Sequence, residues 1–443
     1  MADEVIRAMS KIFIKLPSQQ LKLVTLKPDT TVSLGKFGSF RSNHLIGTAS
    51  GQPYEILEHG EIRPVRLSML EDTLGSEDQR SNQKIEDVQT NQILNTDDIE
   101  LLKKDKSLTG SDIVARVIGA HQRFEQKSAF AQQKYTRRKE EKFTRGFTAC
   151  RPNVQNIVEY LLNKDPMKIH YMSIETLSLI LSMADASSAG RYLVVEDVGG
   201  LVVGSLLERM GEQGEVMLLH EGEHPNLNYT TMLDLPAERV DKMVKTLDLL
   251  QALIPDEEDY SQSFQPVDED GNKVQTDGSR RRASRREQLK LRQADFQAGN
   301  FDALILCTSL DVTTLLPHLI PAIALSGSLV IYSRFKEALL PVHAYLNALP
   351  SKQVIHIDIQ DIRLRGYQVL PGRTHPLMTG RSGGGYLLTG IRVAPAEGVE
   401  AFGFDGGRRK RERSREDSGR KKSKMEDPDE ESLADGSQTK DEV

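Results

Sequence analysis

The sequence predicts an α/β protein in which a small antiparallel β domain and a helical linker precede a doubly wound sheet domain. Three observations support this prediction. Short alternating strands with turn formers fill the first 70 residues or so, and strand and helix patterns alternate from residue 149 to about 398. A glycine-bearing turn at 197–204 joins the first strand of the second region to a helix, as in nucleotide-binding α/β domains.

The first domain is assigned to residues 1–108. Apolar and polar residues alternate at 21–26 and 31–34, with turn formers such as Pro17, Pro28 and Gly35 between them, which is typical of antiparallel strands. Residues 72–98 are almost wholly polar, so they bury too little surface to offset the entropy of ordering. We therefore expect a disordered insertion there.

Residues 109–148 are expected to form a basic helical linker. Capping residues at 109–112 precede an apolar pattern, and helical character continues to about Phe147. At about 100° per residue, five basic side chains fall on one stripe of the helix: Lys127, Lys134, Arg138, Lys142 and Arg145. Arg137 and Lys139 widen this stripe. A solvated face is the plain alternative. The shared sign, the shared face and the adjacent Phe143 and Phe147 favour contact with phosphates.

The sheet domain is assigned to residues 149–398. Its predicted strands are 191–196, 216–219, 301–306, 328–332, 353–359 and 386–393, and its predicted helices are 236–253, 312–325 and 336–349. Pro317 and Pro321 should kink or shorten the second of these helices. Residues 256–286 join an acidic run to a basic run and are expected to be a second disordered insertion.

The turn at 197–204 departs from a working cofactor loop. The pattern acid-x-Gly-x-Gly-x-Gly needs its later glycines because a Cβ there collides with the ligand or the following helix. With Asp197 as the acid, Gly199 is kept, whereas Leu201 and Val203 replace the other two glycines. The sequence predicts a domain that folds without binding its nucleotide, with these two apolar side chains filling the space.

No catalytic or metal site is predicted. No predicted helix carries two histidines at metal-ligand spacing, no Gly-x-Ser-x-Gly pattern joins a predicted strand to a helix, and no Gly-x-x-x-x-Gly-Lys-Ser/Thr loop occurs. The two cysteines, Cys150 and Cys307, exclude a disulfide framework and fit a reducing compartment. Cys307 follows a strand without a placed histidine, so we expect a buried structural thiol. Asp311 is expected to cap the next helix.

Two charged regions remain. Gly- and Pro-rich loops at 363–386 carry Arg373, His375 and several tyrosines, which can contact phosphates and bases; the alternative is a mobile connection between strands. Residues 399–443 form a charged tail, expected to be disordered. Its basic clusters at 408–413 and 420–424 suit a nuclear import signal or polyanion binding, and otherwise a solubilising tail. No apolar run approaches the roughly 20 residues that span a bilayer, so no membrane segment is expected.

An ordered set of short motifs resembles a known family, the non-catalytic subunit of the eukaryotic tRNA (adenine-58-N1) methyltransferase. The motifs lie at 13–18, 35–40, 45–47, 133–143, 196–200 and 367–376. The resemblance implies an N-terminal β-barrel and a Rossmann-like methyltransferase domain that has lost S-adenosylmethionine binding. It also implies a catalytic paralogue that binds this cofactor, with two heterodimers forming a heterotetramer, and a contribution to the tRNA surface.

Residue types and resemblance together predict that this chain holds tRNA by its backbone while another subunit donates the methyl group. The residues expected to face RNA are basic and lie on the linker helix or the late loops: Lys134, Arg137, Arg138, Lys142, Arg373 and His375. The end of the strand at 306–310 lacks the acid and proline with which adenine-modifying relatives hold the base. Two alternatives stay open: an RNA-binding scaffold in translation initiation, and an autonomous methyltransferase that uses Glu221 for the ribose.

Overall fold

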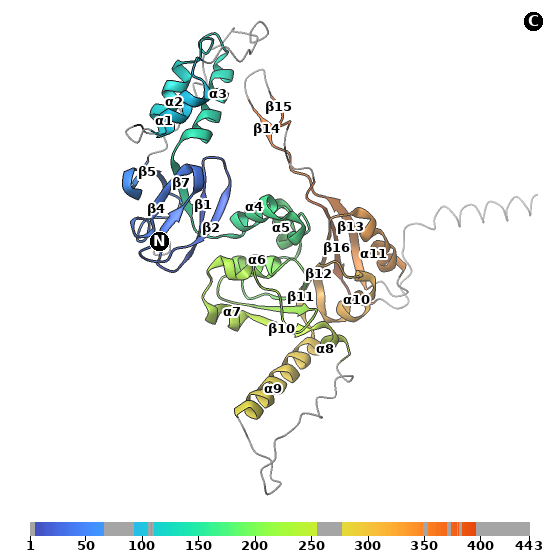
Figure 1. The fold of residues 1–443 in the computed structure, drawn as a ribbon. Helices are drawn as coiled ribbons and strands as arrows, with labels where there is room; N and C mark the ends of the chain where they lie inside the picture. Colours follow the sequence, from blue (N-terminus) through green and yellow to red (C-terminus); the bar gives the residue numbers. More distant parts are fainter. Residues whose placement is uncertain are drawn as a thin grey trace, which may run out of the picture. The chain divides into compact units, whose positions relative to one another are not determined.

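The computed structural model describes residues 5–65, 93–104, 108, 110–254, 277–348, 353–369, 374–378, 380 and 383–395. The described residues up to Ala394 belong to one compact unit (Figure 1). Most of the first predicted insertion, at 72–92, and the charged tail beyond 395 lie outside the described residues.

The N-terminal strands form an antiparallel sheet in the order β2-β1-β7-β5-β6. Side chains of β1 alternate between two cores because successive strand residues point to opposite faces. Ile12 and Ile14 join the core of this sheet, whereas Phe13 packs against Tyr160 of the following domain. The strand bounds are β1 (Lys11–Lys15), β2 (Leu21–Thr25), β5 (Pro53–Ile56), β6 (Ile62–Pro64) and β7 (Gly146–Cys150), with a separate pair β3 (Thr31–Ser33) and β4 (Ser39–Arg41).

The predicted antiparallel arrangement is confirmed, but a closed barrel is not observed. Among the described residues, β2 and β6 are the two ends of the sheet and do not pair with each other. The prediction that the linker helix continues to about Phe147 is also wrong. Phe147 lies in β7, which pairs with both β1 and β5. Phe147 stacks on Phe40 at 4.4 Å between ring centroids, so tertiary packing overrides the helical pattern there.

The linker contains more than one helix. Its described helices are α2 (Gly110–Gly119) and α3 (Ala129–Phe143), and α1 (Thr96–Lys104) precedes them. Helix α2 begins at Gly110, within the predicted capping range 109–112. Helix α1 includes residues 96–98, which fall in the range predicted to be disordered. Ser128 caps α3 by accepting a hydrogen bond from the backbone of Ala131. A small core holds α2 against α3, made by Ile113, Val114, Val117 and Phe143.

The second domain contains a seven-stranded sheet in the order β10-β9-β8-β11-β12-β16-β13. Strands β10, β9, β8, β11 and β12 pair in parallel, and β16 is antiparallel to both of its neighbours. The predicted doubly wound sheet is thereby confirmed. The bounds are β8 (Arg191–Glu196), β9 (Glu215–His220), β10 (Val244–Asp248), β11 (Phe301–Cys307), β12 (Ile323–Ser333), β13 (Val354–Asp361) and β16 (Tyr386–Arg392).

Helices cover both faces of this sheet. Along β8, Tyr192 and Val194 join one core, whereas Leu193 and Val195 join the other. Helices α4 (Val154–Lys164), α5 (Ile174–Met183) and α6 (Leu201–Met210) pack in the first core. The second core receives side chains of α8 (Leu249–Leu253), α9 (Asp277–Ala298), α10 (Val312–Leu319) and α11 (Lys336–Ala348). Two buried layers per strand explain the continuous apolar runs in the sequence.

Two predicted elements of this domain are wrong. The helix expected at 236–253 is α7 (Ala237–Met243), strand β10 and α8, because Val244 and Leu247 are buried as β10 pairs with β9. Residues 277–286 belong to the predicted disordered insertion, yet they are helical in α9. The rest of that insertion, 255–276, lies outside the described residues.

The proline prediction is confirmed. Helix α10 ends at Leu319, two residues before Pro321, and continues only as a 3-10 turn. Asp311 caps α10 as expected, since its carboxylate accepts from the backbone of Thr313 at 2.9 Å. Within the described residues, no helix combines the length and apolarity that crossing a membrane requires.

Candidate functional site

The glycine turn lies where the strand order of the sheet reverses, at the carboxyl ends of β8 and β11. Ligands of doubly wound sheets bind at this position. Gly199 and Gly200 have φ angles of +77° and +81°, in the left-handed region that favours glycine. The backbone of the turn thus favours glycine at both positions.

The chain's own residues cover this turn. A Cβ on Gly199 would lie 2.6 Å from Cε2 of Tyr229, and one on Gly200 would lie 2.8 Å from Cα of Leu227. The backbone N–H of Tyr229 donates to Gly199 O at 2.9 Å, and the hydroxyl of Thr230 donates to Gly200 O at 2.6 Å. Because a nucleotide ligand needs close approach to these glycines, the residues present do not fit S-adenosylmethionine here.

The residues that fill the site differ from those predicted. Leu201 and Val203 are 1% and 0% exposed and lie on α6 in the core, as any well-packed helix residues would. The covering residues Leu227, Tyr229 and Thr230 come instead from the segment between β9 and α7, which contains the 3-10 helix Thr230–Leu233. Nothing in their sequence marks this contact, so only the fold could reveal it. Glu221, the ribose ligand of the autonomous-enzyme alternative, is exposed.

The N-terminus of α6 binds a carboxylate from within the chain. Glu196 accepts hydrogen bonds from the backbone N–H groups of Val202 at 3.1 Å and Val203 at 3.0 Å. Burial raises the pKa of Glu196 to about 7, although these hydrogen bonds and that of Leu201 favour the charged form. A helix N-terminus attracts anions, and here Glu196 already satisfies it.

Polar contacts also connect the loops around the turn. Asp197 accepts from Ser309 N at 2.8 Å and from Ser309 Oγ at 2.5 Å, and its other oxygen lies 3.2 Å from His170 Nε2. This is not a serine-hydrolase triad, because the hydroxyl donates to the carboxylate instead of contacting the imidazole. The three side chains hold the ends of β8 and β11 together.

Cys307 has the environment of a structural thiol. It is fully buried, as predicted, and burial raises its pKa well above the usual range, with the carboxylates of Glu196 and Asp197 adding to the effect. The thiolate needed for nucleophilic attack is thereby disfavoured. Across the part of the chain that the structure describes, no group of three or more His, Cys, Asp or Glu side chains could hold a metal ion.

Helix α3 presents the predicted basic face in part. Lys134, Arg138 and Lys142 are exposed and four residues apart, and Arg137 lies on the same helix. Phe143 packs against α2, while Lys139 Nζ lies 4.9 Å from the centre of the Tyr135 ring. Burial, aided by the charge of Lys142, lowers the pKa of Lys139. The exposed basic side chains of α3 thus belong to a helix that is held in place by an apolar contact with α2.

Two members of the predicted stripe do not belong to this face. Lys127 precedes α3 and is only 8% exposed, with Nζ 5.4 Å from the centre of the Tyr135 ring. Arg145 follows the helix and is half-buried. Their seven- and three-residue spacings suggested a continuous helix, but the helix begins after Ser128 and ends at Phe143.

The late loops form a hairpin next to a cleft. Strands β14 (Tyr367–Gln368) and β15 (His375–Pro376) pair, and His375 is exposed. Arg373 lies outside the described residues. The hairpin and its stem carry exposed apolar side chains, namely Leu364, Tyr367, Val369, Leu377 and Met378. His375 and the α3 residues lie on separate elements, so a single RNA surface made by the six predicted residues stays a prediction.

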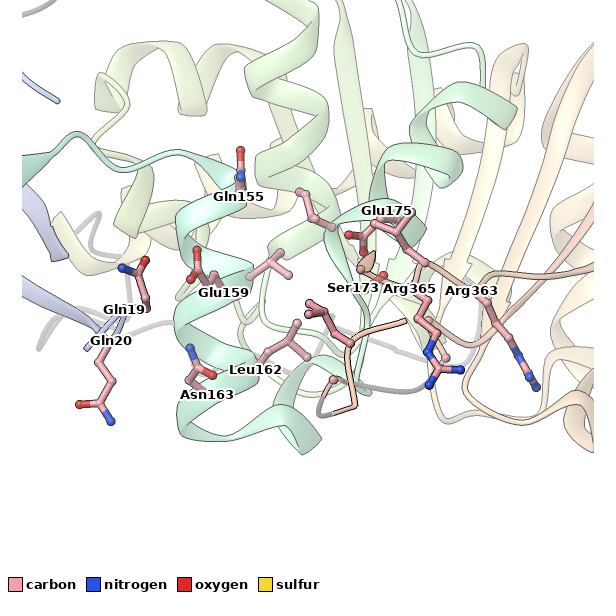
Figure 2. A pocket seen from close by; sticks show the side chains of 18 of the residues that line it. Gln19, Gln20, Gln155, Glu159, Leu162, Asn163, Ser173, Glu175, Arg363 and Arg365 are labelled. Carbon is pink, nitrogen blue, oxygen red and sulfur yellow. The ribbon is translucent and has the colours of Figure 1, made fainter. Parts of the chain in front are cut away.

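The cleft has a volume of about 920 Å³. Figure 2 shows Gln155, Glu159 and Asn163 of α4 along one wall and the two arginines Arg363 and Arg365 along another. The turn between β1 and β2 and the start of α5 complete the lining. One wall therefore carries a single acidic residue among amides, the other carries two arginines, and Leu377 and Met378 of the hairpin also line the cleft.

The family model that matches this chain is that of the Gcd10p family, over residues 5–276. This chain belongs to the Gcd10p family. It is 35% identical over 426 residues to the tRNA (adenine(58)-N(1))-methyltransferase non-catalytic subunit TRM6 of Debaryomyces hansenii, covering 90% of this chain and 89% of that one. The trm6 subunit of Schizosaccharomyces pombe is 32% identical, covering 94% and 97%. The resemblance seen in the sequence is confirmed.

Among solved structures, the chain is similar to the tRNA (m1A58) methyltransferase TrmI of Aquifex aeolicus. The identity is 11%, the alignment covers 88% of this chain and 99% of that one, and the TM-score is 0.45.

Proposed function

We propose that this chain is the non-catalytic, tRNA-binding subunit of a tRNA (adenine-58-N1) methyltransferase, which supports N1-methyladenosine formation by a catalytic paralogue. The observation that carries the proposal is the closed glycine turn: Tyr229 and Thr230 lie over Gly199 and Gly200, and Glu196 occupies the α6 N-terminus. A methyltransferase-type sheet closed in this way contributes surface instead of a methyl donor. S-adenosylmethionine is then bound by the partner.

The tRNA surface is proposed to include the exposed face of α3. Lys134, Arg138 and Lys142 stand four residues apart, a spacing that lets one helix side follow a phosphate backbone. Arg137 of the same helix is proposed to join them, and Arg373 and His375 are proposed as a second group on the late loops. Because such contacts release counterions, binding should be strongly salt-dependent.

The partner surface is proposed to include the hairpin. Val369 and Met378 are 75% and 88% exposed, unusually high for large apolar residues of one hairpin. A two-stranded hairpin is marginally stable alone in water, so it gains most from packing against another protein. The relatives are named as subunits, which supports the catalytic paralogue as that protein. Two such heterodimers are proposed to form a heterotetramer.

A nuclear location is proposed from the tail alone. Its basic clusters at 408–413 and 420–424 have the composition of a bipartite import signal. Replacing both clusters with alanine in a fluorescent fusion should redistribute the protein to the cytoplasm, and an unchanged nuclear signal would remove this part of the proposal.

The decisive experiment compares three samples: this chain, the catalytic subunit, and the two co-expressed. Each is assayed for tRNA methylation and, by calorimetry, for S-adenosylmethionine binding. Only the co-expressed complex should methylate efficiently, and this chain alone should give no binding heat. Methylation by this chain alone would support the autonomous enzyme. Tight RNA binding without any effect on a catalytic subunit would support a translation scaffold.

The interface is tested with Val369→Ser and Met378→Ser together. These exposed residues add little packing within this chain, so its folding should be unchanged while the partner co-purifies in lower yield. A matched variant, Met167→Ser, alters a residue of 69% exposure on another surface and should leave the yield unchanged. Full recovery of the partner with the double variant would exclude the hairpin as the interface.

A further inference from the structure

Helix α9 consists of two halves with opposite character. Its C-terminal half is fixed to the sheet domain: Arg292 donates to Thr246 O at 2.8 Å, Asp295 pairs with Arg191 at 2.8 Å and with Lys245 at 3.1 Å, and Phe296 is buried. Figure 1 shows this end beside α8 and β10. The base of the helix is therefore held by both ionic and apolar contacts.

The N-terminal half is basic around its whole circumference. From the start of the helix at residue 277 to residue 292 the sequence has seven basic residues and two acidic residues, Asp277 and Glu287. At about 100° per residue, the described basic positions are distributed around all sides of the helix. Four of these side chains are exposed, namely Arg280, Arg281, Arg285 and Lys290, and Arg286 is half-buried. This half has no apolar stripe with which to pack on the rest of the chain.

Such a helix carries an electrostatic cost in isolation. Arg281 and Arg285 are exposed and four residues apart. Like charges at this spacing destabilise a helix by about as much as opposite charges stabilise it. The helix N-terminus adds further positive potential. A dense line of negative charge would remove this repulsion, whereas a neutral or apolar partner would not.

We infer that the N-terminal half of α9, residues 280–290, is an RNA-backbone-binding arm of this subunit, separate from the α3 face. The inference rests on the proposed function, which supplies a tRNA. Arginine predominates over lysine in the arm, and its planar fork suits bidentate contact with phosphate. The arm extends about 15 Å at the helical rise per residue, long enough to contact several phosphates. Its fixed base holds the charges in a defined place.

The test uses the complete complex with the catalytic subunit and a transcribed tRNA. Arg280→Glu, Arg281→Glu and Arg285→Glu are introduced together, and the dissociation constant is measured by fluorescence anisotropy over a range of salt concentrations. The constant should rise about tenfold or more. The slope of log affinity against log salt should become shallower by about 0.7–0.9 for each phosphate that the arm no longer neutralises. A matched variant with lysine at all three positions keeps the charge and should retain most of the affinity.

A second measurement does not depend on how the triple variant folds. A photoreactive residue at Ser284, as in Ser284→p-benzoylphenylalanine, lies on the exposed arm and should cross-link to tRNA. Unchanged affinity and slope with no cross-link would overturn the inference. Dissociation of the catalytic subunit from the triple variant would also overturn it, because the arm would then bind protein.

The two proposals can fail separately. If the arm variant binds tRNA normally while Arg138→Glu with Lys142→Glu does not, the arm is excluded and the proposed function stands. If the unmodified complex shows no tRNA binding, the proposed function fails and the arm fails with it.

Discussion

The N-termini of α6 and α9 show two opposite uses of the same positive helix end. At α6, a buried carboxylate from the preceding strand satisfies the backbone N–H groups, and Tyr229 covers the glycines in front of them. At α9, exposed arginines add to the positive potential. Side chains of the domain itself cover the ligand site of the sheet, and the fold is kept. The positive charge that a partner can reach lies instead on helices outside the sheet.

This contrast separates stability from function within one domain. Changes at the closed turn should alter the free energy of unfolding with little effect on RNA. Changes on the basic helices should alter RNA binding with little effect on unfolding. Four variants, taken in order of decreasing effect, test that separation.

Tyr229→Ala should lower the free energy of unfolding by about 3–5 kcal/mol, because an 8% exposed aromatic ring leaves a cavity over Gly199. Urea denaturation of the purified chain measures this. Tyr229→Phe keeps the ring and should cost about 1 kcal/mol or less. Equal stability of Tyr229→Ala and the parent would mean that the ring does not support the turn. Recovery of S-adenosylmethionine binding by Tyr229→Ala alone would show that Tyr229 is the sole obstacle.

Glu196 should give the stability a distinctive pH dependence. Its folded pKa of about 7 lies above the ordinary value of 4.5, so folding binds a proton between these pH values. The resulting stability is complete below pH 4.5 and is lost as the pH rises through 7, amounting to about 3 kcal/mol. Glu196→Gln cannot titrate. The difference in unfolding free energy between parent and variant should change by that amount across this range, and a constant difference would contradict the assignment.

Arg138→Glu with Lys142→Glu should raise the dissociation constant for tRNA roughly tenfold to hundredfold, since two charge-assisted contacts become repulsive. Unfolding should be unaffected because both side chains are exposed. The control Arg138→Lys with Lys142→Arg keeps both charges. An unchanged constant in the first variant would remove α3 from the RNA surface.

Ser309→Ala should have the smallest effect, about 1 kcal/mol of unfolding free energy, since it removes one hydroxyl hydrogen bond to Asp197 and keeps the backbone one. Differential scanning calorimetry can detect the lower melting temperature. Methylation by the complex should be unchanged, and a large fall in activity would indicate a role for this loop beyond holding β8 and β11 together.

Sequence patterns predicted most of the fold because periodicity reports burial. Strands such as β9 and β11 and the helix α11 lie close to their predicted ranges. Errors occurred where pairing overrode local preference. Val244 to Asp248 reads as helix but forms an edge strand beside β9, and Phe147 reads as helix but lies in β7. Residues 277–286 read as disordered because of their charge, although a fixed C-terminal half extends the helix through them.

The altered cofactor loop can be recognised without any structure, since Leu201 and Val203 stand where glycine is needed, and the ordered motifs identify the family. The residues that cover the loop become visible only in the folded chain. Tyr229 and Thr230 reach Gly199 and Gly200 from 30 residues away along the chain. A missing glycine is a local property that the sequence displays. The filling of a site depends on which distant segment folds over it, and that contact leaves no periodic pattern.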